Sequence, residues 1–134
     1  MFNRNTFISR LLRAVAILLV LSNFSCTQKV KTVIDPAFSA YISAFTSGTI
    51  SREASIRVRL SSDVVQTNEI NAPASKNPFT FSPAIKGNAY WIDSRTIEFR
   101  PSDKMEQGKT YKSSFALSEV MKVPAKFSKF DFDF

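Results

Sequence analysis

Apolar and polar residues alternate along most of this 134-residue chain, a pattern that predicts β-strands rather than helices. Ile56, Val58 and Leu60 alternate with arginines, as expected for a strand with one buried face and one solvated face. The same period of two recurs at Phe79 and Phe81, Ile97 and Phe99, Tyr111, Ser113, Phe115 and Leu117, and Phe130, Phe132 and Phe134.

Turn-forming residues separate these segments at intervals of about ten residues. Clear breaks occur at Ser82-Pro83, Lys86-Gly87, Asp93-Ser94 and Gln107-Gly108. We expect Gly87 to adopt a positive φ in its turn. Because no long segment with a helical period follows the first 25 residues, the pattern predicts an all-β fold, an antiparallel β-sandwich of about seven strands.

The core of this sandwich is expected to be aromatic, with Trp91 at its centre. The chain has thirteen phenylalanines, and its single cysteine cannot form an internal disulfide. Tyr90 and Ile92 face the opposite side from Trp91, so this strand has apolar residues on both faces. We therefore expect the strand to be central in its sheet or covered by a partner.

Residues 1–25 have the pattern of a signal peptide. Arg4, Arg10 and Arg13 precede an uninterrupted apolar run at residues 14–21. Eight residues are far fewer than the roughly 20 that span a bilayer as a helix. We expect this segment to direct export.

Cys26 follows the signal peptide, and residues 21–26 resemble the lipidation signal of bacterial lipoproteins. The resemblance implies that Cys26 is diacylated and becomes the new N-terminus, although Asn23 stands where an aliphatic residue is usual. Thr27 then favours delivery to the periplasmic face of the outer membrane. The alternative is an ordinary secretory signal that leaves Cys26 as a free thiol. We predict a signal peptide at 1–25, a lipid anchor and tether at 26–37, and a folded domain at 38–134.

The charge and composition narrow the possible functions. Of eighteen basic residues, three precede Cys26, which leaves fifteen against eleven acidic residues and a net charge of +4. These charges are interleaved, so we expect no nucleic-acid partner. The chain has no histidine, which excludes a Ser/His/Asp or Cys/His catalytic site and a histidine-ligated metal. We expect a protein without enzymatic activity, cofactor, metal or small-molecule substrate.

Charged residues on the predicted strands have simple structural explanations. Arg57 and Arg59 form a basic stripe that could contact a lipid headgroup or a partner, but we favour a solvated strand face, because exposed alternating charge is normal for a strand with one buried side. Asp131 and Asp133 supply fewer oxygens than the six to eight that calcium needs, so we interpret them as protection of a sheet edge.

Three other acidic residues suggest a glycosidase, namely Glu98, Asp93 and Asp103. Such enzymes need two carboxyl groups that face each other across a cleft. A strand and its flanking turns indicate no such cleft, so we reject this function.

The C-terminal strand is the most promising candidate for binding. Phe130, Phe132 and Phe134 share one side of it, and an unpaired strand of this kind docks onto a following domain or another chain. We therefore take these three residues as a candidate partner-facing edge.

A series of segments resembles the N-terminal immunoglobulin-like domain of large bacterial alpha-2-macroglobulin lipoproteins. The resemblance covers residues 38–134, and its most specific part runs from Phe81 through Trp91 and Pro101 to the Gly108-x-x-Tyr111 motif. The matching segments are 38–41, 47–52, 56–60, 81–83, 86–87, 91–93, 95–101, 108–111 and 130–134.

This resemblance implies an immunoglobulin-like sandwich that belongs to a much longer protease trap. Family members trap proteases after cleavage of a bait segment, and many use a Cys-x-Glu-Gln thioester. Here Cys26 precedes Thr27-Gln28-Lys29, so neither the thioester nor a bait carries over. We expect a fragment of a protease inhibitor that serves as a membrane-proximal spacer and presents its far edge to the next domain. The alternative is a free-standing lipoprotein whose domain binds a surface protein or glycan.

Overall fold

The computed structural model describes residues 32–66 and 69–134 of the protein. Lys31–Phe134 forms one compact unit. The expected signal peptide and residues 26–31 of the expected anchor and tether lie outside the described residues. The 3₁₀-helix η1 (Pro36–Ala40) begins the ordered elements, with Asp35 as its N-cap. The strands are β1 (Ile42–Phe45), β2 (Ile56–Leu60), β3 (Phe79–Ser82), β4 (Gly87–Trp91), β5 (Thr96–Pro101), β6 (Lys112–Phe115) and β7 (Phe130–Asp133).

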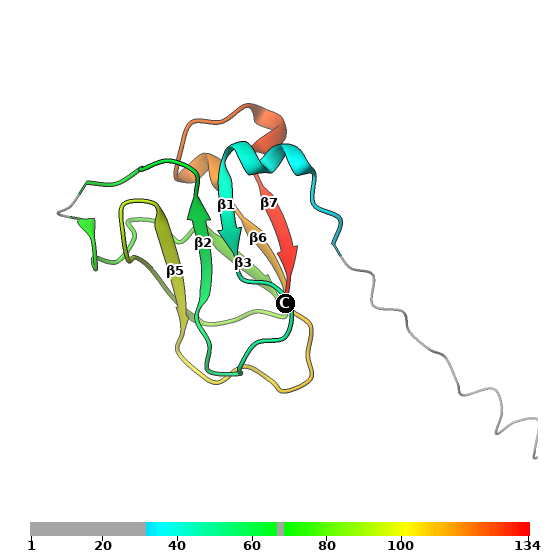
Figure 1. Ribbon diagram of the computed structural model, residues 1–134. Coiled ribbons are helices and arrows are strands. Elements are labelled where there is room, and N and C mark those ends of the chain that lie inside the picture. The colour runs from blue at the N-terminus through cyan, green and yellow to red at the C-terminus, as the bar shows by residue number, and fades with distance from the viewer. Residues whose placement is uncertain (1–31, 67–68) are drawn as a thin grey trace, which may run out of the picture. The chain divides into compact units, whose positions relative to one another are not determined.

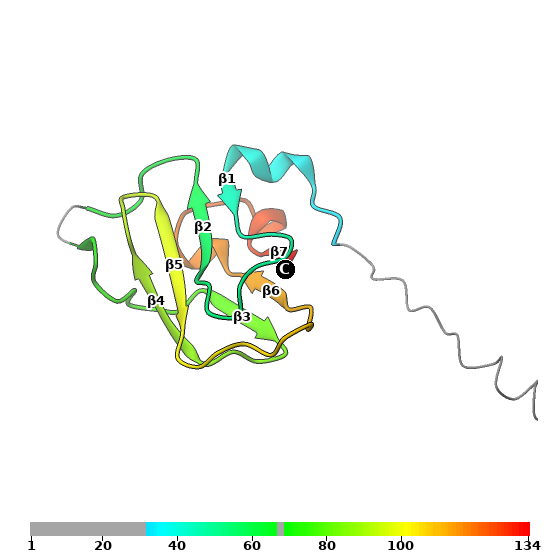
Figure 2. The same cartoon turned by 60° about the horizontal axis from the view of Figure 1, so that its bottom comes forward.

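The strands form two antiparallel sheets that pack face to face, as Figure 1 and Figure 2 show. One sheet has the order β1-β2-β5-β4, and the other has the order β3-β6-β7. Constant-type immunoglobulin domains divide seven strands in this way, with A, B, E and D in one sheet and C, F and G in the other. The expected immunoglobulin-like antiparallel sandwich is confirmed.

The alternating residues face the space between the sheets. Ile56, Val58 and Leu60 of β2 are fully buried, while the arginines between them are exposed. Phenylalanine rings join the two layers, since the ring centroids of Phe81 in β3 and Phe99 in β5 lie 4.7 Å apart. Trp91 is 6% exposed and belongs to this core, as expected.

The strand that carries Trp91 is not central, contrary to one of the two expectations. β4 is the last strand of its sheet, and residues 71–74 of the same chain cover its outer edge. The N–H of Asn71 donates to the carbonyl of Trp91 at 2.7 Å, and the N–H of Ala74 donates to the carbonyl of Ala89 at 2.9 Å. The chain itself therefore pairs with the outer edge of β4, and the side chains of Tyr90 and Ile92 on the other face are half-buried.

Two glycines serve different purposes. Gly108 adopts a φ of 72° in the connection between β5 and β6, where a residue with a side chain is strained. Gly87 does not have the expected positive φ, because it lies within β4 rather than in a turn. A Cβ atom at Gly87 would collide with the carbonyl oxygen of Arg100 and the ring of Phe99. Close packing of β4 on β5 therefore requires this glycine.

Tyr111 forms a tyrosine corner just before β6. Its buried hydroxyl accepts a hydrogen bond from the N–H of Glu106 at 2.9 Å, which ties the connection to the core. In antibody domains the second cysteine follows this tyrosine by two residues. Ser113 stands there in this chain, is 2% exposed, and has no hydrogen-bond partner for its hydroxyl among the described residues. The corner thus occurs without the inter-sheet disulfide.

We expect Tyr111→Phe to lower the free energy of unfolding by about 1 kcal/mol, because it removes the hydroxyl that accepts from Glu106 while keeping the ring. Urea denaturation at neutral pH measures the change. Tyr90→Phe is the matched control, since the ring of Tyr90 contacts Arg100 on the outer face. Equal losses in the two variants would contradict a specific role for the corner.

Candidate functional site

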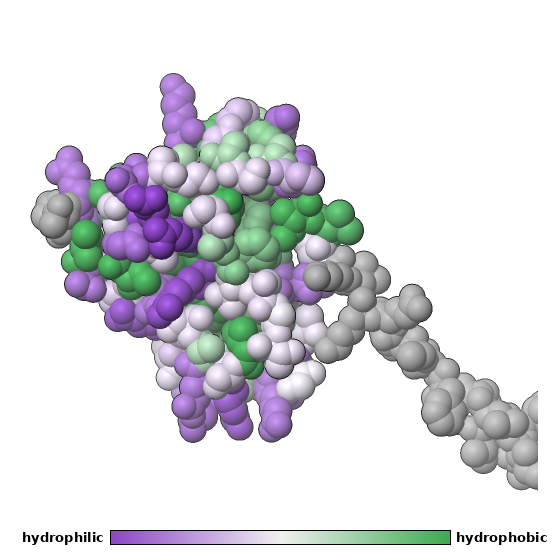
Figure 3. Space-filling model, viewed as in Figure 1, coloured by the Kyte–Doolittle hydropathy of each residue, from purple (hydrophilic) through white to green (hydrophobic). Residues whose placement is uncertain are grey.

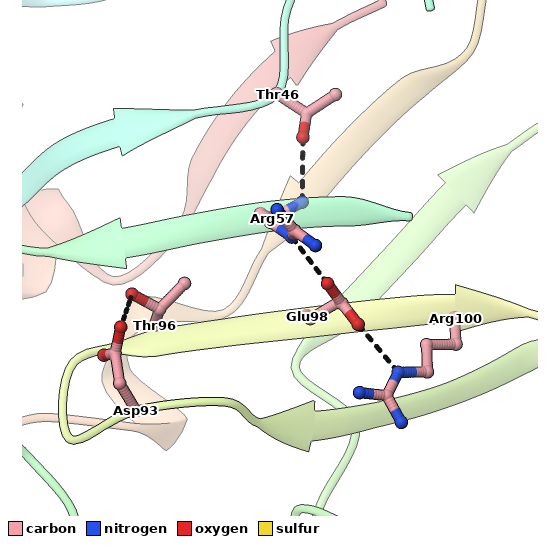
Figure 4. Close-up of polar contacts among 6 residues, drawn as sticks. All are labelled: Thr46, Arg57, Asp93, Thr96, Glu98 and Arg100. Atoms are coloured by element: carbon pink, nitrogen blue, oxygen red, sulfur yellow. Dashed lines mark hydrogen bonds and ion pairs between the residues drawn. The ribbon is translucent and has the colours of Figure 1, made fainter. Parts of the chain in front are cut away.

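The outer face of the four-stranded sheet carries a cluster of paired charges, shown in Figure 4. Arg57 in β2 lies directly opposite Glu98 in β5, and its Nε donates to Glu98 Oε2 at 2.5 Å. Arg100, two residues further along β5, donates from its Nε to Glu98 Oε1 at 2.7 Å. Each carboxylate oxygen of Glu98 therefore has its own arginine.

Glu98 is the buried member of this cluster, with a side chain that is only 6% exposed. Burial by itself raises the pKa of its carboxyl group. The hydrogen bonds and positive charges of Arg100 and Arg57 outweigh this effect, so the pKa lies below its ordinary value of 4.5. The guanidinium of Arg100 also lies 4.5 Å from the ring centroid of Tyr90, which holds the cluster against β4.

Asp93 organises the turn between β4 and β5. Its Oδ1 accepts from the N–H of Arg95 and its Oδ2 accepts from the hydroxyl of Thr96, both at 2.8 Å. Burial by itself raises the pKa of Asp93. These hydrogen bonds and the positive charge of Arg59 lower the pKa by more than burial raises it, so the net shift is downward. The carboxylate is therefore a structural part of the turn that the sequence predicted at Asp93-Ser94.

An open hollow of about 360 Å³ lies on this face between the two groups of charges. Figure 3 looks onto the face and shows strongly hydrophilic residues gathered over β2 and β5. Both arginines of the predicted basic stripe, Arg57 and Arg59, line the hollow, and Arg57 is also paired with Glu98. The residues that line the hollow are Ala44, Phe45, Thr46, Arg57, Arg59, Ile92, Asp93 and Thr96.

The acidic residues considered for a glycosidase do not converge. Asp93 precedes β5 and Asp103 follows it, so a six-residue strand of about 20 Å separates them. Glu98 lies between them with both oxygens occupied by arginines. Among residues 32–66 and 69–134, no group of three or more potential ligands could hold a metal ion.

The same part of the chain contains no helix long and apolar enough to cross a membrane.

The phenylalanine side chains expected to face a partner belong to the domain's own core. Phe130 and Phe132 are each 1% exposed. Phe134 is half-buried and stacks on Tyr111, with ring centroids 5.7 Å apart. The alternation of β7 was interpreted correctly, but the apolar side faces the other sheet, so these rings are not free to bind a partner in this conformation.

β7 has backbone groups that could pair with another strand, because β7 is the last strand of its sheet. Tyr111 and Phe134 exchange both of their backbone hydrogen bonds, at 3.0 and 3.1 Å. In an antiparallel pair such residues alternate with residues whose N–H and C=O point away from the neighbour. Asp131 and Asp133 are in those alternate positions, so their backbone groups point to the edge of β7 that no other strand of the described residues covers.

The chain enters the domain beside this edge. The N–H of Thr32 donates to Asp133 Oδ1 at 3.0 Å, which places the entry of the described chain next to its last strand. That the domain presents its far edge to a following domain stays a prediction. Any chain that continued beyond Phe134 would leave beside Thr32, so the domain would add little length between the two.

Comparisons with known proteins identify no family for this chain. No protein-family model matches it, and no curated protein matches it. Among solved structures it is similar to the crystal structure of L,D-transpeptidase 3 from Mycobacterium tuberculosis in complex with a faropenem-derived adduct. That match has 14% sequence identity and a TM-score of 0.43, and it covers 71% of this chain and 37% of that chain. The chain thus spans little more than a third of that structure's length.

We expect Glu98→Gln to lower the free energy of unfolding by about 1 to 2 kcal/mol at neutral pH, because it removes the buried charge that two arginines hold. The folded-state pKa of Glu98 is lowered, so its contribution is complete above pH 4.5 and is lost as the pH falls through the folded-state pKa. Urea denaturation across this range should show the wild-type and Glu98→Gln curves converging in acid.

Glu106→Gln is the matched control, because Glu106 pairs with Lys109 at 3.4 Å on the exposed surface. Its effect on the unfolding free energy should be much smaller at every pH. A Glu98→Gln variant that lost no stability at neutral pH would show that the arginines do not stabilise the fold through this carboxylate.

Proposed function

We propose that this chain is a non-catalytic interaction module of an alpha-2-macroglobulin-like protease inhibitor, held at the bacterial cell envelope by a lipid on Cys26. The open edge of β7 beside the chain entry carries this proposal, because an edge strand with outward N–H and C=O groups pairs readily with another chain. The sequence resemblance over residues 38–134 supports the choice of family. The Gly108-x-x-Tyr111 motif, which is part of this resemblance, has a physical explanation in the tyrosine corner.

The proposed mechanism is mechanical. The lipid on Cys26 holds the chain at the periplasmic face of the outer membrane, and residues 27–37 provide reach. Asp131 and Asp133 then pair through their backbone with a strand of a following domain or of another chain, while their carboxylates discourage unspecific edge pairing. Because entry and exit lie side by side, the domain acts as a lateral attachment point rather than as a length-adding spacer.

The second candidate is a free-standing lipoprotein whose immunoglobulin-like domain binds a surface protein or glycan. The open hollow beside Arg59 favours it, since a polar ligand would find hydrogen-bonding groups of Arg59 and Thr46 there. Reading the gene beyond the codon for Phe134 distinguishes the two candidates. A long open frame that encodes more sandwich domains supports the protease inhibitor, whereas an authentic stop codon supports the free-standing lipoprotein.

We expect the exported protein to begin at an acylated Cys26. Intact-mass analysis of the membrane fraction should show a chain that lacks residues 1–25 and carries the additional mass of the acyl groups. Cys26→Ser should remove that mass and release the protein from membranes that have been washed with salt, because buried methylenes supply most of the membrane affinity. A mature chain that starts at Thr27 or later, or a Cys26 without acyl groups, would refute the anchor.

We expect the outward amides of β7 to be protected in the complete gene product but not in the isolated domain. Amide-resolved hydrogen exchange should show Asp131 and Asp133 exchanging rapidly in Lys31–Phe134 alone and slowly when the rest of the gene product is attached. The amides of Phe130 and Phe132 are internal controls, since β6 holds them in both forms. Unchanged exchange at Asp131 and Asp133 would contradict docking through this edge.

A further inference from the structure

The connection between β6 and β7 is unusually long for a hairpin. Fourteen residues separate Phe115 from Phe130, whereas hairpin connections commonly have about two to five residues. We call residues 116–129 the β6–β7 loop. Two short 3₁₀-helices, η3 (Leu117–Glu119) and η4 (Ala125–Phe127), give it a defined shape, and Leu117 and Phe127 bury it against the core. A long loop that a scaffold holds in one shape is typical of a binding element.

The loop carries an excess of positive charge. Lys122, Lys126 and Lys129 are exposed, and none pairs with a carboxylate in the part of the chain that the structure describes. Glu119 is the only acidic residue of the loop, and Lys76 from outside the loop neutralises it at 2.9 Å. The loop therefore presents three unneutralised ammonium groups.

Apolar residues lie between these lysines. Met121 and Val123 are half-buried, and Pro124 and Ala125 are exposed at the start of η4. The ammonium of Lys126 lies 4.6 Å from the ring centroid of Phe127, so its aliphatic stem follows the apolar surface. Lysines interleaved with small and medium apolar residues suit the interface of a membrane, where apolar groups enter the headgroup layer and ammonium groups meet phosphates.

The loop is also within reach of the expected lipid anchor. The ring of Phe38 in η1 packs edge-on against Phe127 of η4 at 5.1 Å, so the entering chain passes along the loop. From Cys26 to Thr32 the chain extends at most about 20 Å, which exceeds the roughly 13 Å length of β7. A lipid on Cys26 can therefore reach the end of β7 that joins the loop.

We propose that the β6–β7 loop is a second membrane contact, which binds anionic phospholipid headgroups through Lys122, Lys126 and Lys129. The choice of a membrane over an acidic protein rests on the proposed lipid anchor at Cys26. An acyl anchor combined with a basic patch gives stable and oriented attachment, because each basic residue near an anionic surface adds to the affinity of the acyl chains. In this arrangement the open edge of β7 keeps a constant orientation to the membrane.

The test uses residues 27–134 without Cys26, since Lys31–Phe134 forms a compact unit with its own core. Sedimentation with vesicles of phosphatidylcholine and phosphatidylglycerol measures binding, and vesicles of phosphatidylcholine alone give the background. We expect binding only to the anionic vesicles, with a loss as salt is added. Replacing Lys122, Lys126 and Lys129 by Gln should weaken binding about a hundredfold, at about fivefold for each lysine.

A second triple variant provides the matched control, because it removes the same charge from the opposite end of the sandwich. There the connections are joined by the hydrogen bonds Met105 N–H to Arg52 O and Ser102 N–H to Lys86 O. The residues to replace by Gln are Arg52, Lys86 and Lys112, which are all exposed. This variant should retain nearly all of the binding.

Equal weakening in both triple variants would overturn the proposal, since only net charge would then matter. Equal binding of the wild type to both kinds of vesicle, or to neither, would also overturn it. A loop that ignores vesicles but retains an acidic protein from the envelope would assign the lysines to a protein partner instead. Because the assay lacks Cys26, its outcome is independent of whether the cysteine is acylated and of which family the chain belongs to.

Discussion

The stability of this domain depends on phenylalanine rings that pack between its two sheets. Phe99 of β5 meets Phe81 of β3 at 4.7 Å, and Phe45 of β1 meets Phe130 of β7 at 5.0 Å, so both pairs cross from one sheet to the other. Antibody domains add a disulfide across this space, whereas this chain has a single cysteine, at position 26. Aromatic contacts and apolar burial must therefore hold the sheets together.

This packing decides which parts of the molecule are free to interact. Phe130 and Phe132 are buried in the core, so the edge of β7 exposes outward backbone groups and not phenylalanine rings. On the outer face, Arg57 and Arg100 enclose Glu98 and leave Arg59 beside an open hollow. The basic β6–β7 loop can project because Phe127 fixes its base. The candidate surfaces therefore consist of the backbone edges, side chains and loops that do not pack into the core.

The strand pattern was predictable because a period of two needs only local sequence. The burial of β2 and the position of Trp91 followed from it, as did the turn at Asp93. The partners of those strands were not predictable, because many registers bury the same alternating residues. For that reason the Arg57–Glu98 pair was missed, although the sequence placed both residues on outer faces. For the same reason, the sequence did not predict that β7 lies at an edge of its sheet or that residues 71–74 pair with β4.

By itself, the sequence determined that this protein builds a β-sandwich with an aromatic core, since alternation and turn residues act over a few neighbouring positions. Only the tertiary structure decided which strands lie at the edges and that Thr32 meets Asp133, 101 positions away. It also decided that Gly87 is needed for close packing against Arg100 rather than for a turn. These features depend on which distant segments of the chain contact each other. An alternating pattern of apolar and polar residues specifies the buried face of each strand but not the segment that the strand contacts.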